Sequence, residues 1–198
     1  MAKKKQLPRG LRNNNPLNIR KGAQRWQGQT GNDGAFCIFE SMEYGYRAAF
    51  RLLHTYNTKY KIYSVREIIY RWAPPYDHNN TSAYIERVCQ TAGLKETDLI
   101  VVNSWIDEKR YEAIWLVWAM AKVENGNDFI TFADMEKVRK GYSLAFGKWK
   151  VEKEVKMEVI KGSKKGSRRG RYQLTIHTSC TKCLISPLTP NLTPTLTP

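Results

Sequence analysis

The strongest helical pattern of the chain runs from Asp107 to Glu124, and it constrains the fold more than any other feature. Acidic residues at its start favour a helix N-terminus, where they interact well with the helix dipole. Asn125-Gly126 follows its last turn and predicts an αL-type C-cap. Its apolar residues recur at three- and four-residue spacing, at Ile114, Val117, Trp118 and Ala121. We therefore expect a buried helix at the centre of a mainly α domain.

Shorter patterns predict the rest of the domain. Further helices are expected over 42–56, 65–72, 82–92 and 133–146, with Ser41, Ser64 and Thr81 as N-caps. Ser64 and Glu67 match a capping box, and Pro74-Pro75 stops that helix. Residues 12–26 are expected to form a loop, 35–39 a small strand, and 97–103 either a helix or a strand. The predicted fold class is mainly α (α+β) with a small β element.

Charge divides the chain into three parts. Residues 1–25 hold eight basic residues and no acidic one, whereas 26–147 hold 14 basic and 15 acidic residues. Residues 148–171 are again strongly basic, and 187–198 repeat Leu-Thr-Pro. We expect a disordered basic leader at 1–8, one folded domain at 9–147, and a basic Ser/Gly/Thr/Pro-rich tail at 148–198. The basic ends suit a polyanion, or are simply solvated.

Several classes of protein and site are not expected. No apolar segment follows the charged start, so no signal peptide is predicted, and no run of about 18 apolar residues predicts a transmembrane helix. The near-neutral domain lacks a nucleic-acid-binding motif, so no specific nucleic acid is expected as a partner. No metal-ligand spacing or cofactor motif stands out, and a zinc or redox role for Cys180-x-x-Cys183 is a weak alternative.

Glu124 is the first candidate for a catalytic group. It follows Val117 by seven residues and Ala121 by three, so it shares the apolar face of its helix. Apolar surroundings and the negative end of the helix dipole both disfavour a charged carboxylate. A carboxylic acid that stays protonated is what a glycosidase needs to protonate a leaving oxygen; lysozyme is the known example. Alternatively, Glu124 turns outward at the helix end.

Polar and aromatic residues elsewhere suit carbohydrate. Amide and guanidinium groups can bind sugar hydroxyls and N-acetyl groups, and aromatic rings can stack on sugar rings. The alternatives are a loop whose asparagines bind the backbone, and aromatic side chains that pack in the core. The candidate substrate-binding residues are Asn13, Asn14, Asn15, Asn18, Arg20, Trp26, Trp72 and Tyr84, with Tyr76 as a further possible platform.

Two acids are candidates for a second catalytic carboxylate. Asp77 lies in the loop that follows Pro74-Pro75, where a turn role is the alternative. Asp33 lies in Gly31-Asn32-Asp33-Gly34, which reads first as a turn. A hydrolase needs a second carboxylate at about 5–9.5 Å from the first, whereas a lytic transglycosylase does not.

The order of motifs resembles a family of small phage and prophage proteins, often described as virion structural or lytic transglycosylase-like proteins. The resemblance rests on RGLRNNNPLNIR at 9–20, WQGQ at 26–29, Trp72-Ala73-Pro74-Pro75, and a helix that ends in Glu124-Asn125-Gly126. It spans about residues 9–146. The loop Asp77-His78-Asn79 departs from the family pattern, which weakens a role for that acid.

The resemblance implies a lysozyme-like fold and a function. Many peptidoglycan-cleaving enzymes place the glutamate helix before the Asn-rich segment, whereas here it comes last, so the chain resembles a circular permutation of them. We therefore expect an enzyme that cleaves peptidoglycan, most simply a lytic transglycosylase with Glu124 as acid and then base. A two-carboxylate hydrolase and an inactive virion protein on the same fold are the alternatives. The expected location is the virion, or the host cytoplasm with release to the cell wall.

Overall fold

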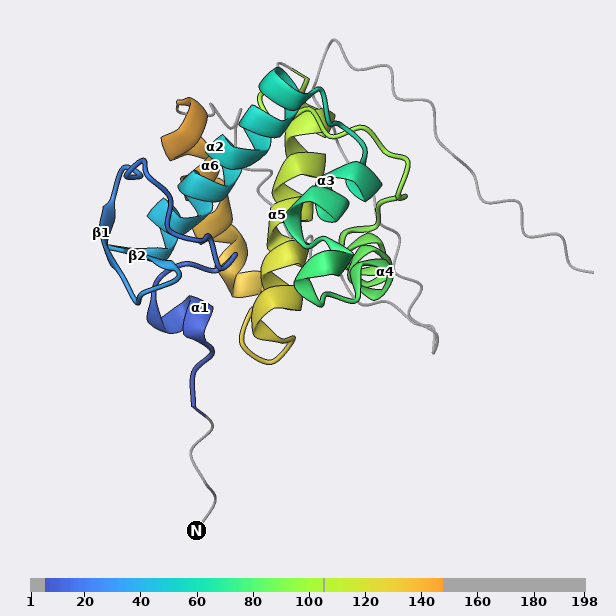
Figure 1. The fold of residues 1–198 in the computed structure, drawn as a ribbon. Coiled ribbons are helices and arrows are strands. Elements are labelled where there is room, and N and C mark those ends of the chain that lie inside the picture. The colour runs from blue at the N-terminus through green and yellow to red at the C-terminus, as the bar shows by residue number, and fades with distance from the viewer. Residues whose placement is uncertain (1–5, 105, 148–198) are drawn as a thin grey trace, which may run out of the picture. The chain divides into compact units, whose positions relative to one another are not determined.

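The computed structural model describes residues 6–104 and 106–147. They form a helical body around the buried helix α5 (Asp107–Asn125). Figure 1 shows α5 with α3 (Val65–Trp72) and α4 (Thr81–Ala92) on one side and α2 (Met42–Tyr60) and α6 (Met135–Phe146) on the other. The predicted mainly α class with a small β element is confirmed. Residues 1–5 of the predicted leader at 1–8, and the whole tail at 148–198, lie outside the described residues.

The central position of α5 follows from its composition. Residues 113, 114 and 116–121 are all buried, so the helix is apolar on more than the one face that its spacing predicted. A helix that is hydrophobic on every side belongs inside a protein. Its C-cap differs from the prediction: Gly126 has a positive φ of 89° but a ψ of 149°, outside the αL region.

Local signals set the other helix boundaries. The capping box of Ser64 and Glu67 is present at the start of α3. Ser41 lies at the N-cap of α2 without a side-chain cap bond, and that helix runs on to Tyr60, past the predicted end. The prediction of Thr81 as a cap is wrong. Asn80 caps α4 by accepting from the Ala83 N–H, while the Thr81 hydroxyl donates to the buried Ala73 carbonyl at 2.6 Å.

The N-terminal part adds a short helix and a hairpin. α1 (Arg9–Arg12) leads into the Asn-rich loop, and β1 (Gln29–Asn32) pairs antiparallel with β2 (Cys37–Phe39). β2 lies within the predicted strand, whereas β1 was not predicted. Two short 3-10 helices, η1 (Pro75–Asp77) and η2 (Phe132–Asp134), precede α4 and α6.

Residues 97–103 form neither the predicted helix nor a regular strand. Their backbone is held by separate partners instead: the Ile100 N–H donates to the Tyr63 carbonyl, and the Val102 N–H donates to Asn57 Oδ1. Ile100 and Val102 are buried, so this irregular segment still contributes to the core.

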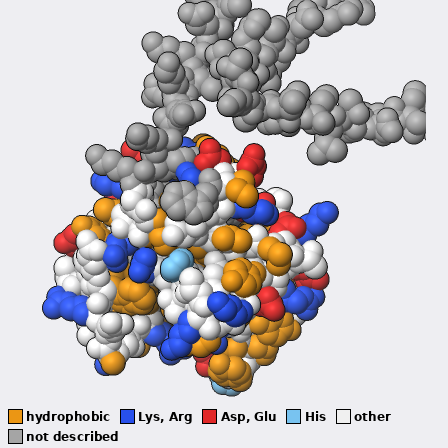
Figure 2. All heavy atoms as spheres, turned by 90° about the horizontal axis from the view of Figure 1, so that it is seen from above, with side chains coloured by type: hydrophobic (Ala, Val, Ile, Leu, Met, Phe, Trp, Pro, Cys, Tyr) orange, Lys and Arg blue, Asp and Glu red, His pale blue; other side chains and the backbone are white. Residues whose placement is uncertain are grey.

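The surface of the described residues shows mixed charge. Figure 2 shows Lys and Arg side chains dispersed among hydrophobic and polar ones on the face it presents. This agrees with the near-neutral balance of residues 26–147. Among the helices of the described part, none is long and apolar enough to cross a membrane.

Candidate functional site

Glu124 lies in the last turn of α5, half-buried, and three side chains donate hydrogen bonds to its carboxylate. Tyr84 Oη donates to Oε1 at 2.9 Å, and Trp72 Nε1 donates to the same oxygen at 3.3 Å. Asn18 Nδ2 donates to Oε2 at 2.9 Å. Glu124 therefore does not turn out freely into solvent: its carboxylate is oriented by donors from three separate segments of the chain.

Each donor is placed by local structure. Trp72 is the last residue of α3, which the Pro74-Pro75 pair ends. Tyr84 lies in the first turn of α4, whose start is fixed by the Asn80 cap and by the Thr81 bond to Ala73. Asn18 adopts a left-handed backbone conformation with φ 47°, which asparagine tolerates better than most residues.

Tyr84 is a donor that does not titrate near neutral pH. Burial raises the pKa of its hydroxyl well above the ordinary value of 10.0, and the charge of Glu124 and the hydrogen bond to it act in the same direction. The hydroxyl therefore keeps its proton and remains available to the carboxylate. Asn18 contributes differently, because its Oδ1 is buried without a hydrogen-bond partner while its Nδ2 binds Glu124.

Asn125 fastens the N-terminal segment to the end of α5. Its Nδ2 donates to the Pro16 carbonyl at 2.7 Å and to the Ala121 carbonyl at 2.8 Å. Gly10 lies so close that a Cβ there would collide with the Asn125 side chain. This contact brings the loop that carries Asn18 against the turn that carries Glu124. The sequence places Asn125 on the buried face, four residues after Ala121, but carries no signal for this contact.

The first three asparagines of the loop have structural roles in this conformation. Asn15 is completely buried, and its side chain binds the backbone of Ile19 and Cys37 through three hydrogen bonds. Asn14 donates to the Phe39 carbonyl, and Asn13 donates to Asp33. The bonds of Asn15 to Cys37 and of Asn14 to Phe39 hold the loop on the backbone of β2, whereas Asn13 binds the side chain of the turn residue Asp33. A fully buried Asn15 has no surface with which to contact a substrate.

The two candidate second carboxylates have other partners. Asp33 accepts from the backbone N–H groups of Phe36 and Ala35 and from Asn13. These bonds lower its pKa, with the Phe36 N–H as the largest cause. Asp33 is thus a turn residue of the hairpin. Asp77 is exposed and forms an ion pair with Arg20 at 3.7 Å. No hydrogen bond is found between either acid and Glu124 within the part of the chain that the structure describes.

Of the predicted binding residues, the structure brings Asn18, Trp72 and Tyr84 together around Glu124. Arg20 lies on the surface beside Asp77. Trp26 is half-buried and packs against the core, and its backbone N–H donates to Gln29. Within residues 6–104 and 106–147, no group of three or more His, Cys, Asp or Glu side chains is placed to bind a metal ion.

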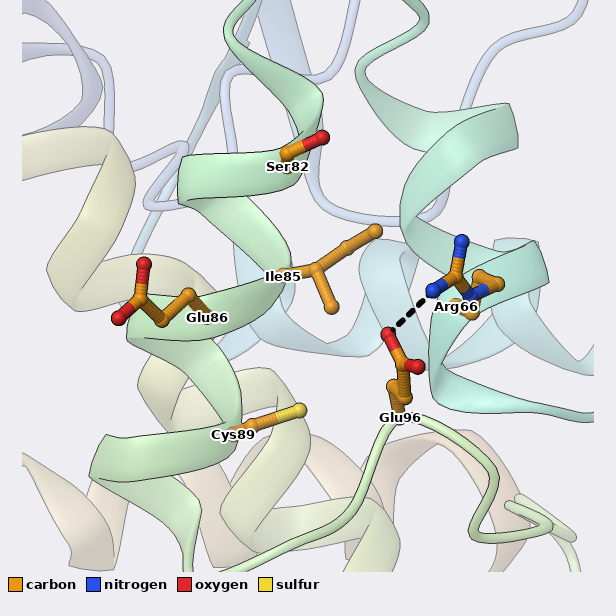
Figure 3. Close-up of a pocket in the computed structure, with 6 residues that line it drawn as sticks. All are labelled: Arg66, Ser82, Ile85, Glu86, Cys89 and Glu96. Carbon is orange, nitrogen blue, oxygen red and sulfur yellow. Dashed lines mark hydrogen bonds and ion pairs between the residues drawn. The ribbon is translucent and has the colours of Figure 1, made fainter.

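Two hollows lie beside these elements. One, of about 300 Å³, lies between α3 and α4, and Figure 3 shows Ile85 and Cys89 pointing from α4 toward the ion pair of Arg66 and Glu96. The other, of about 550 Å³, is here called the aromatic groove. Its lining includes Tyr56, Glu67, Tyr70, Arg71, Pro74 and Tyr76.

The chain is similar to a bacteriophage protein. The two are 36% identical over 143 residues, which cover 70% of this chain and 82% of the phage protein. That relative is protein P5 of Pseudoalteromonas phage PM2, and the chain belongs to the family of this phage protein. No protein-family model matches the chain.

Proposed function

We propose that this chain cleaves the glycan strands of bacterial peptidoglycan, with Glu124 as its general acid. The observation that carries the proposal is the set of three donors that converge on one half-buried carboxylate at the end of the most buried helix. Side chains that hold a carboxyl group in one orientation support proton transfer, because the first condition for a general acid is its geometry.

The hydrogen bonds distinguish the two oxygens of the Glu124 carboxyl group. A carboxylate has about two acceptor positions on each oxygen. Both positions of Oε1 are taken by Tyr84 and Trp72, whereas Oε2 accepts one bond, from Asn18. The free position on Oε2 is therefore where a proton can sit and from which it can pass to a glycosidic oxygen.

The reaction that fits one oriented carboxylate is that of a lytic transglycosylase. Glu124 protonates the oxygen of the leaving sugar, and the C6 hydroxyl of muramic acid attacks C1 of its own ring. Glu124 then accepts the proton of that hydroxyl, so the reaction consumes no water and needs no second carboxylate. A hydrolase would need a second carboxylate, and both candidates have other partners. Asp33 accepts hydrogen bonds within the hairpin turn, and Asp77 forms an ion pair with Arg20.

The same proposal includes the fold relationship. We infer that residues 9–147 are a lysozyme-like domain in which the glutamate helix follows the Asn-rich segment instead of preceding it, as in a circular permutation. The contact between Asn125 and Pro16 supports this, because it puts the first structured segment beside the end of α5. Chain ends that lie close together in a domain make a permutation feasible.

The family relationship suggests where the protein works. Protein P5 comes from a phage, so we infer that this chain acts on the cell wall from a virion or a prophage, with other phage proteins as possible partners. A virion protein that kept this site without activity is the competing function, and the following experiment distinguishes the two.

The parent protein and Glu124→Gln are compared on purified cell walls in a zymogram and in a turbidity assay. The amide keeps the shape of the side chain but cannot donate the proton, so lysis falls by about 10²–10⁴-fold. Glu86→Gln, at an exposed carboxylate on α4, is the matched control and keeps the parent rate. Equal clearing by Glu124→Gln, or no clearing by the parent, contradicts the proposal.

The products decide between transglycosylase and hydrolase. Digested sacculi are analysed by mass spectrometry, and we expect muropeptides that end in 1,6-anhydro-muramic acid, lighter by one water than reducing ends. If only reducing ends are found, and Asp77→Asn or Asp33→Asn is inactive, then the enzyme is a two-carboxylate hydrolase.

A further inference from the structure

The aromatic groove adjoins the site of Glu124 without being part of the chemistry described above. Tyr56 lines this groove, and its ring meets the ring of Trp72 edge to face, with centroids 6.5 Å apart. Trp72 in turn donates to Glu124. The groove and the carboxylate are therefore linked through two aromatic rings in contact.

The groove presents aromatic surface to solvent. Tyr70 is 41% exposed and Tyr76 is 82% exposed, so both rings are open to contact with a ligand. Pro74-Pro75 restrict the backbone that carries Tyr76, so this ring sits on a constrained segment. The volume of about 550 Å³ is within the range of small-molecule sites.

Polar groups in the groove are already ordered, and their charges balance. The guanidinium of Arg71 lies 3.8 Å from the ring centroid of Tyr60 and 5.0 Å from that of Tyr56. Glu67, held by the capping box, supplies the opposite charge. A groove that carries one cation and one anion does not select for a polyanion, whereas ordered donors and acceptors beside aromatic faces suit a neutral polyhydroxylated ligand.

We propose that the aromatic groove is a binding subsite for the neutral sugar residues of a glycan strand, next to the bond cleaved at Glu124. This inference rests on the proposed function, because it takes its ligand class from the substrate of that reaction. Tyr70 and Tyr76 pack against the apolar faces of the sugars, and Arg71 and Glu67 bind their hydroxyls. The subsite holds the strand at a distance from the reacting bond, so it contributes to affinity and not to proton transfer.

Binding is tested without catalysis. The full chain with Glu124→Gln is titrated with a β-1,4-linked N-acetylglucosamine hexasaccharide and followed by NMR. We expect shifts at the groove, and a loss of affinity of roughly two- to tenfold in Tyr70→Ala and in Tyr76→Ala. Tyr76→Phe, which keeps the ring, retains most of the affinity. Phe132→Ala removes another exposed aromatic ring (64% exposed) and serves as the control with unchanged affinity.

The results separate this inference from the proposed function. Groove binding that Tyr76→Ala weakens upholds the subsite even if the parent cleaves no wall. Unchanged affinity in the double variant Tyr70→Ala/Tyr76→Ala overturns it even if the parent is active. Selective binding of a peptide of residues 187–198 also overturns the inference, because proline-rich segments are the other class of ligand that aromatic grooves bind. If the parent is active, Tyr76→Ala raises KM on long strands and leaves kcat unchanged.

Discussion

Asn15 and Asn18 lie three residues apart in the same polar loop, yet they have opposite roles. Asn15 is completely buried, and all of its hydrogen bonds go to the backbone. Asn18 is half-buried, and its amide donates to Glu124 across 106 residues of sequence. Asn15 stabilises the conformation of the loop, and this conformation places Asn18 next to Glu124. Residue type alone therefore does not distinguish a structural amide from a site amide.

Replacing Asn15 tests its structural role in the loop, and this replacement has the largest expected effect on stability. Asn15→Ala leaves the buried Ile19 N–H without its side-chain acceptor and removes one hydrogen bond from each of the carbonyls of Ile19 and Cys37, although the Ile19 carbonyl still accepts from the Cys37 N–H. We expect the free energy of unfolding to fall by about 2–4 kcal/mol in urea denaturation.

Asn127→Ala, at an exposed asparagine, is the control and changes the free energy of unfolding by less than about 0.5 kcal/mol. Equal stability of the Asn15→Ala protein and its parent would remove the distinction between the two asparagines.

Replacing Asn18 tests its role at the site of Glu124. Asn18→Gly keeps the left-handed backbone that φ 47° requires but removes the donor to Oε2. We expect wall lysis to slow by about tenfold, since the Glu124 carboxyl group loses one of the three donors that orient it. The free energy of unfolding changes by less than about 1 kcal/mol.

If Asn18→Gly instead lowers the free energy of unfolding strongly while each folded molecule keeps full activity, then Asn18 has a structural role like that of Asn15. The readouts are the turbidity assay and urea denaturation on the same preparation.

The smallest effect concerns Asp33, which anchors Asn13. Its pKa is lowered in the folded protein, so it contributes stability above the ordinary value of 3.8 and loses this contribution as the pH falls through the folded value. We expect the parent to lose thermal stability below about pH 4 more steeply than Asp33→Asn. Melting curves from pH 2.5 to 6 measure this, and parallel curves would refute it.

The sequence predicted features that depend on neighbours in the chain. The capping box of Ser64 and Glu67 and the run of apolar residues in α5 are local signals, and both are present in the structure. The prediction of Thr81 as a cap was wrong, because nothing local reveals the buried carbonyl of Ala73 to which its hydroxyl donates. β1 has no apolar alternation, and only its pairing with β2 makes it a strand.

The site shows the same limit at longer range. The position of Glu124 on a buried face followed from helical periodicity, and Trp72 and Tyr84 were candidates by residue type. That Asn18, and not its neighbours, reaches the carboxylate depends on a turn in the loop and on the contact with Asn125. Such contacts join distant parts of the chain, and a single sequence carries no signal for them.

The Asn125 contact has a consequence for synthesis. The hydrogen-bond partner of the Pro16 carbonyl, Asn125, lies 109 residues further along the chain, and the partner of Asn18, Glu124, lies 106 residues further. During translation the loop is made early, but it can dock only after the end of α5 has left the ribosome. The carboxylate and its donors are thus assembled late, so a nascent chain released before residue 125 lacks the site altogether.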